Sequence, residues 1–155
     1  ADRPGAKRCK PRLCFPTLAR LASGVLVEAD GSRRLPLKAH STHEPVLAEG
    51  TDETIQLIGA SGFGKPVSET VHRPELFCEL VGCDLHDICT PELYARCIAT
   101  EHASRVVCPD IIVINQVDND RDMASAKRFF LALRAQKDMV EVVAGSLHRH
   151  YLARL

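Results

Sequence analysis

Short, mainly apolar runs that are followed by polar residues or glycine recur along this chain, and each has the length of a strand. Runs of this kind, rich in β-branched residues, predict strands that are buried in a parallel sheet. They lie at residues 25–27, 55–58, 111–114 and 140–143, and the third is purely β-branched. Between them the apolar residues change from the strand period to the helix period.

These intervening stretches carry start and stop signals of helices. The predicted helices are 74–81, which proline opens and glycine follows, a helix that begins at Thr90 and Pro91, and 122–136, with a shorter one at 16–22. Strands that alternate with helices predict an α/β fold of three layers, built on a mostly parallel sheet.

The beginning of the chain differs in composition from the rest. Residues 1–23 hold six basic side chains against one acidic side chain and are interrupted by three prolines. We interpret 1–23 as a basic N-terminal arm with a short helix, and 24–155 as a single α/β domain. A basic arm can bind nucleic acid, but such segments are more often solvated tails.

The bulk composition excludes several classes of function. Basic and acidic residues balance at 20 each, aromatic residues make up 5% and tryptophan is absent, so nucleic acid is not an expected partner. No apolar run has the length of a transmembrane helix, so no membrane is expected as a partner either. Seven cysteines without a CxxC pair favour reduced thiols and a cytoplasmic location.

The run at 25–27 leads directly into Glu28, Asp30 and Gly31. In an open α/β sheet, ligands bind where strands end, and an aspartate there can hold a hydrated Mg²⁺ beside a phosphate. We therefore interpret Glu28 and Asp30 as catalytic candidates and Asp30 as a metal ligand. The alternative is that the aspartate only caps the following turn.

A second signal follows the run at 111–114, in the order Asn115, Gln116, Val117, Asp118. It is close to the N-K-x-D pattern with which GTP-binding proteins read guanine, where the carboxylate accepts two N–H bonds from the base. Gln116 replaces the usual lysine. We interpret Asn115 and Asp118 as nucleotide-binding residues, with a simple turn as the alternative.

Two further motifs carry weaker signals. Residues 59–66 match G-x-x-x-x-G-K but end in proline, which lacks both the hydroxyl for Mg²⁺ and the N–H for phosphate. We read this segment as a flexible glycine-rich connection. His40, His43 and Glu44 have a spacing that zinc can use, although a loop does not force both rings toward one point.

Five short blocks together resemble one known family. They are Glu28-Ala-Asp-Gly-Ser, Pro36-Leu-Lys-Ala, His43-Glu-Pro-Val, Val71-His-Arg-Pro-Glu and Asn115-Gln-Val-Asp. In this order, over roughly residues 24–145, the chain resembles the selenium-dependent hydroxylase accessory proteins, the YqeC-type family.

The resemblance implies a P-loop nucleotide-binding fold and a role in the maturation of molybdenum hydroxylases. It also implies Lys38 and Arg73 as nucleotide contacts, His43 as a metal contact beside Asp30, and His72 as a further polar contact. Members of the family open with a G-x-G-G-K-[ST] loop, which residues 1–23 do not supply. We therefore expect a fold resembling a P-loop NTPase without its first strand and P-loop, and a chain that is the portion C-terminal to that loop.

The function that we expect is Mg²⁺-dependent binding of GTP or ATP by an accessory protein of molybdenum hydroxylases, with hydrolysis left open. Two alternatives remain. One is a non-catalytic interaction module that docks on a hydroxylase or its cofactor through the basic loop 33–43. The other is a carrier of a metal, selenium or sulfur.

Overall fold

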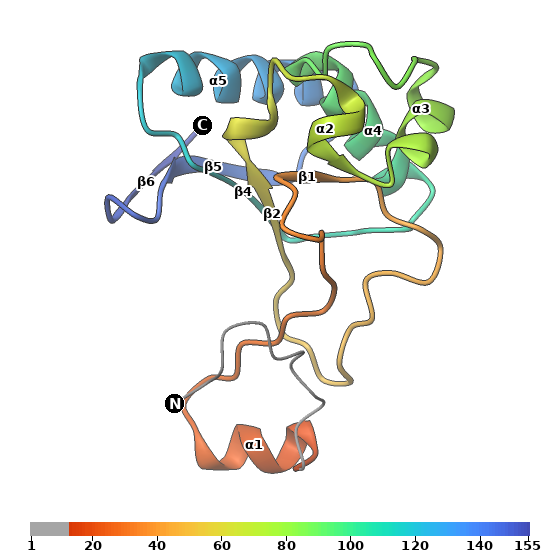
Figure 1. The fold of residues 1–155 in the computed structure, drawn as a ribbon. Coiled ribbons are helices and arrows are strands. Elements are labelled where there is room, and N and C mark those ends of the chain that lie inside the picture. The colour runs from red at the N-terminus through yellow and green to blue at the C-terminus, as the bar shows by residue number, and fades with distance from the viewer. Residues whose placement is uncertain (1–12) are drawn as a thin grey trace.

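A computed structural model describes residues 13–155, so the basic arm predicted for the first dozen residues lies outside the described part. The main sheet has four strands in the order β2, β4, β5, β6 (Figure 1). Their bounds are Ile55–Gly59, Ile111–Asn115, Glu141–Ser146 and Tyr151–Arg154. The first three strands are parallel and β6 is antiparallel to β5, so the prediction of a mostly parallel α/β sheet is confirmed.

Four helices lie on one face of this sheet (Figure 1). They are α2 (Val67–Thr70), α3 (Pro74–Val81), α4 (Pro91–Ala103) and α5 (Asp120–Ala135), while α1 (Phe15–Leu21) lies apart from them. We predicted three layers, but the described residues form only two, the sheet and one layer of helices. On the opposite face, Ile55 and Leu57 of β2 are 52% and 60% exposed.

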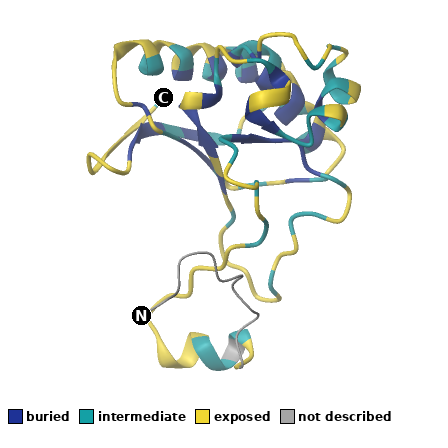
Figure 2. Ribbon diagram, in the orientation of Figure 1, coloured by how far each residue is buried: buried dark blue, intermediate teal, exposed yellow. Residues whose placement is uncertain are grey.

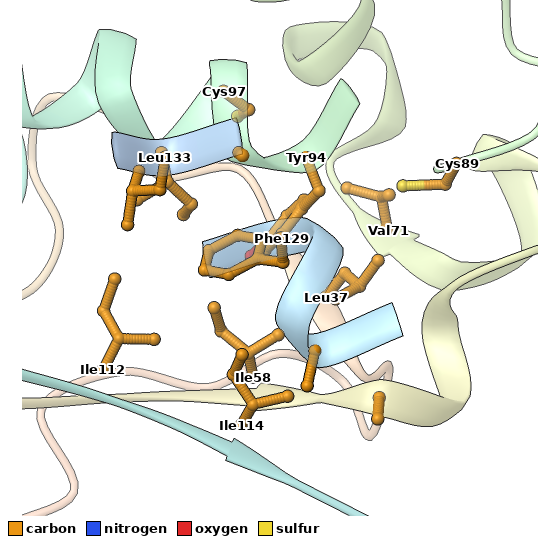
Figure 3. Close-up of a cluster of buried hydrophobic side chains, with 14 of the residues drawn as sticks. Leu37, Ile58, Val71, Cys89, Tyr94, Cys97, Ile112, Ile114, Phe129 and Leu133 are labelled. Atoms are coloured by element: carbon orange, nitrogen blue, oxygen red, sulfur yellow. The ribbon is translucent and has the colours of Figure 1, made fainter. Parts of the chain in front are cut away.

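The hydrophobic core lies between the sheet and the helices (Figure 3). Ile58, Ile112 and Ile114 rise from the strands toward Phe129 of α5 and Tyr94 of α4. The Tyr94 and Phe129 ring centroids are 6.1 Å apart, which is within the range of favourable aromatic pairs. The core thus fastens α4 and α5 to the central strands. Figure 2 shows the same layer as the buried part of the molecule, whereas the segment that leads into it is mostly exposed.

A second, two-stranded parallel sheet joins β1 (Leu37–Lys38) to β3 (Val71–His72). Its strands have only two residues each, which is too short for a periodic pattern that could predict them. Just before β1, the Pro36 carbonyl accepts a hydrogen bond of 2.8 Å from the Gly59 N–H at the end of β2. This contact places β1 beside the carboxyl end of the main sheet.

Most of the predicted elements are confirmed. Gly82 ends α3 in the left-handed conformation with φ of 68°, and Thr90 caps α4 by accepting a hydrogen bond from the Leu93 N–H. The helix predicted from residue 122 begins at Asp120, because the Asn119 side chain caps it. An asparagine before two aspartates is itself typical of a helix start, because the asparagine caps the helix and the acidic side chains favour its first turn.

The strand predicted at residues 25–27 is wrong. Val25 and Val27 are 38% and 43% exposed and Leu26 is fully exposed. Within the described part of the chain, these residues make no backbone hydrogen bond to a strand. A single strand without a neighbour leaves its N–H and C=O groups to water, and apolar composition alone cannot hold it in place. The segment is an extended connection that leads to Asp30.

No helix in the described part of the chain is long and apolar enough to cross a membrane.

Two substitutions on α5 test the position of the core. Phe129→Ala removes a fully buried ring and is expected to lower the free energy of unfolding by about 3–5 kcal/mol. Leu131→Ala, on the 65% exposed side of the same helix, is expected to change it by less than about 0.5–1 kcal/mol. Urea denaturation followed by circular dichroism measures both, and equal losses would contradict this assignment of the buried face.

Candidate functional site

Six charged side chains form one connected network beside β1. They come from the loop before β1, from β1 and the loop after it, from the residue before α3, and from α4. They are Asp30, Lys38, His40, Glu44, Arg73 and Glu101.

Lys38 lies at the centre of this network. Its side chain is only 7% exposed, and its Nζ lies 2.6 Å from Asp30 Oδ2 and 2.8 Å from Glu44 Oε2. The backbone of Lys38 is held by the buried Tyr94 hydroxyl, which accepts from its N–H and donates to its carbonyl. The buried Lys38 ammonium needs the two carboxylates as partners, because the burial of an unpaired charge costs several kcal/mol. The lysine therefore draws onto the core the loop before β1, which carries Asp30, and the loop after β1, which carries Glu44.

Arg73 completes the network on its exposed side. Its guanidinium binds both carboxylate oxygens of Glu44, at 2.5 and 2.9 Å. The hydrogen bonds from Arg73, and then those from Lys38, lower the pKa of Glu44 to about 2. Glu44 is therefore a carboxylate throughout the physiological range.

His40 bridges two carboxylates on the buried side. Its Nδ1 lies 2.9 Å from Glu101 Oε2 and its Nε2 lies 3.3 Å from Asp30 Oδ2. Burial opposes the charge on His40, but the hydrogen bonds to Asp30 and Glu101 outweigh it and raise the pKa of His40 to about 9. With a protonated His40 the network holds three positive and three negative groups, so its charges balance.

Two cavities flank the loop formed by residues 31–36. The larger, of about 470 Å³, lies on the side of the charged network. Its lining residues are Gly31, Arg33, Glu44, His72, Arg73 and Glu75. The two arginines and the histidine in this lining make the cavity suitable for an anionic group, while the two glutamates limit its positive charge.

The smaller cavity, of about 230 Å³, lies outside the carboxyl ends of β2 and β4. Gly59, Ser61, Asn115 and Gln116 line its strand side, and Arg34 belongs to its loop side. A Cβ on Gly59 would lie 2.7 Å from the Pro36 Cβ, so only glycine lets the loop approach β2 this closely. In parallel α/β sheets this edge is the usual place for a ligand.

Left-handed backbone conformations concentrate around these cavities. Arg33, Arg34, Arg73 and Gln116 have φ values of 53°, 67°, 63° and 64°. Each is a non-glycine residue for which this region costs about 1 kcal/mol or more, and such strain gathers at ligand sites. The strain supports a functional reading of the loop and of the end of β4.

Three of the predicted site residues, Asp30, Lys38 and Arg73, join the charged network. Glu28 is exposed on the connection that precedes Asp30, and His43 is exposed outside the network. Among the residues that the structure describes, no group of three or more His, Cys, Asp or Glu side chains is arranged to hold a metal ion.

The predicted base-reading residues lie at the end of β4, but only one of them lines a cavity. Asn115 lines the smaller cavity, and its Oδ1 accepts a hydrogen bond from the Leu147 N–H. Asp118 lines neither cavity; its Oδ1 accepts from the Ser146 hydroxyl at 2.7 Å, and its side chain is 49% exposed. Asp30 also lines neither cavity, so the two aspartates do not face a common cavity.

The glycine-rich segment 59–66 is ordered, not flexible as we expected. It forms a 3₁₀ turn (η1, Ala60–Gly62), and its Phe63 and Gly64 N–H groups donate to Ala60 and Cys89 carbonyls. Because these two N–H groups are already bonded, they do not cradle a phosphate, which agrees with the reading of this motif as a connection.

Sequence reasoning missed Glu101 and Tyr94 as parts of the site. Tyr94, Cys97, Ile98 and Glu101 recur at helical spacing on the buried face of α4. A glutamate at a core position must find a partner, so this break in the apolar stripe was the available signal.

Known proteins match this chain in its N-terminal part. Residues 7–75 match the family model described as YqeC protein. An uncharacterized protein, YqeC of Escherichia coli (strain K12), is 42% identical over 59 residues, which are 37% of this chain and 23% of the relative. The chain thus spans about a quarter of that relative's length. No solved structure matches the chain.

The match confirms the YqeC-type recognition for residues 7–75. It includes four of the five sequence blocks and every member of the charged network except Glu101. The block that ends in Asp118 lies outside the matched residues.

The charge on His40 makes the stability of the fold depend on pH. Its pKa is about 9 in the folded state and about 6.5 in an unfolded chain, so the stabilisation is complete below pH 6.5 and is lost as the pH rises through 9. We expect His40→Gln to lack this contribution of about 3 kcal/mol. Urea denaturation of both proteins between pH 6 and pH 9.5 measures the difference, with the exposed His148→Gln as control. A difference that stays constant with pH would exclude a charged His40.

Proposed function

We propose that this chain, which is YqeC-type over residues 7–75, binds a purine nucleoside triphosphate at the two cavities beside the loop 31–36. The observation that carries the proposal is the smaller cavity at the carboxyl ends of β2 and β4, where a nucleotide binds in parallel α/β sheets. The fold resembling a P-loop NTPase, which the family resemblance implies, is part of this proposal.

The larger cavity suits the phosphates. Arg33 and His72 line it, and Arg73 offers five N–H donors, of which Glu44 engages two. Arg34 extends the positive charge to the smaller cavity on the other side of the same loop. A phosphate chain that follows the loop would therefore meet cationic groups on both sides.

The base would lie toward the end of β4. Asn115 and Gln116 line the smaller cavity, and Asp118 follows two residues later with half of its side chain exposed. Ser146 uses one lone pair of one carboxylate oxygen, and a carboxylate has about four such positions. Asp118 therefore retains acceptors for the two N–H groups on the edge of guanine.

Magnesium would bind with the nucleotide. Asp30 is the proposed ligand, and because its Oδ2 is bonded to Lys38 and lies near His40, the metal would use Oδ1. Mg²⁺ usually takes only one or two protein carboxylates, with phosphates and water as its other ligands. Glu28 and Asp30 are the carboxylates that would orient water if the nucleotide is hydrolysed. His43 is the second, weaker metal candidate.

The accessory role toward molybdenum hydroxylases rests on the family resemblance. The alternative of docking through the basic loop 33–43 has less support, because Lys38 and His40 are buried in ion pairs and offer little charge to a partner. Nucleotide binding is therefore the first activity to test.

Calorimetric titration with Mg²⁺–GTP and Mg²⁺–ATP tests the proposal. We expect binding of at least one nucleotide and a loss of about tenfold or more in Arg34→Asn, which removes the charge but tolerates a positive φ. The matched control is Arg105→Asn, which changes an exposed arginine with φ of 57° away from both cavities. If neither nucleotide produces heat of binding, and circular dichroism shows that the protein is folded, nucleotide binding is refuted.

Asp118→Asn tests how the base is read. An amide in place of the carboxylate offers an N–H group, which suits the C2 carbonyl of xanthine better than the C2 amine of guanine. We expect affinity to shift from Mg²⁺–GTP to Mg²⁺–XTP, with no shift in the neighbouring exposed Asp120→Asn. Unchanged affinities for GTP, ATP and XTP would show that Asp118 does not read the base.

A further inference from the structure

Two cysteine thiols lie next to each other at the end of α3. The Sγ atoms of Cys78 and Cys83 are 3.5 Å apart, and both residues are partly exposed. This pair is separate from the charged network and from both cavities, and the proposed function does not use it.

The local sequence brings these thiols together. Gly82 follows the last residue of α3 in the left-handed conformation, and its N–H and that of Cys83 both donate to the Cys78 carbonyl, at 2.8 and 3.3 Å. This helix ending reverses the chain and folds Cys83 back over the last turn of the helix. The proximity of the two sulfur atoms therefore results from the backbone of this helix ending and not only from the side-chain rotamers.

The other described cysteines differ from this pair in position or access. Cys89 and Cys97 are fully buried, and Cys14 and Cys108 are exposed, with no second thiol recorded in contact with either. Among the residues that the structure describes, only Cys78 and Cys83 combine access to solvent with a neighbouring thiol.

We propose that Cys78 and Cys83 form a redox-active dithiol that closes to a disulfide by exchange with a low-molecular-weight disulfide. In the first step one cysteine thiolate attacks the small disulfide, forms a mixed disulfide and releases one small thiol. In the second step the neighbouring cysteine attacks the mixed disulfide, forms the Cys78–Cys83 bond and releases the second small thiol. Two hydrogen atoms pass from the protein to the two released thiols, so the exchange balances.

The geometry favours the second step over the first. A thiol that is already beside the mixed disulfide reacts as an intramolecular group, with a high effective concentration. Burial and the adjacent Cys78 thiol raise the pKa of Cys83 to about 12, which keeps this thiol protonated at neutral pH.

Mass spectrometry under graded ratios of oxidised to reduced glutathione tests the proposal. The experiment uses the full chain and a variant in which Cys9, Cys14 and Cys108 are replaced by serine, so that the pair and the two buried thiols remain. We expect the loss of two hydrogen atoms per molecule, and peptide mapping without reductant is expected to join Cys78 to Cys83.

Single substitutions make the test specific. In this background, Cys78→Ser or Cys83→Ser is expected to abolish the cross-link completely and to leave a stable glutathione adduct on the remaining thiol. Cys97→Ser, which changes a buried thiol of α4, is expected to retain the cross-link. Circular dichroism checks that each variant is folded. The proposal is overturned if all four thiols remain free at the most oxidising ratio, if the adduct persists without a cross-link, or if the bond forms to Cys89.

Discussion

The burial of the Lys38 ammonium is the constraint on which the rest of this structure depends. A cation that is 7% exposed must be neutralised, and Asp30 and Glu44 approach it from the loops before and after β1, which have little regular structure of their own. Arg73 and His40 then compensate these carboxylates, and Glu101 compensates His40. Because every charge has a partner, the network holds residues 30–44 against α4 and β3 and supplements the pairing of β1 with β3, which covers only two residues of each strand.

The same constraint shapes the candidate ligand site. Fixing Asp30 and Lys38 at the two ends of the loop leaves residues 31–36 as a ridge between the two cavities. The ridge presents Arg33 to one cavity and Arg34 to the other, both in left-handed conformations. An arrangement in which a strained arginine pair borders the carboxyl edge of a parallel sheet is suited to an extended anion, and this is the physical basis of the nucleotide proposal.

Charge balance also explains why the predicted roles and the observed contacts differ. Asp30, Lys38 and Arg73 were singled out as separate ligand contacts, but the structure joins them into one set of ion pairs. Their first effect is to position the loop, and a ligand would reach them from the exposed side at Arg73. Asn115 and Asp118 lie at the carboxyl edge of the main sheet, away from this network. Their side chains connect the end of β4 to the end of β5 and to the residue that follows it.

The sequence by itself determined the strands β2, β4 and β5 and the helices α3, α4 and α5, because their periodicity and caps act over a few neighbouring residues. It also marked Asp30, Lys38 and Arg73. Only the tertiary structure decided that residues 25–27 are not a strand, because a strand exists through its partner. The tertiary structure alone likewise decided that Glu101 and Tyr94, more than fifty residues along the chain, complete the surroundings of His40 and Lys38, since burial brings charges together without regard to their separation in sequence.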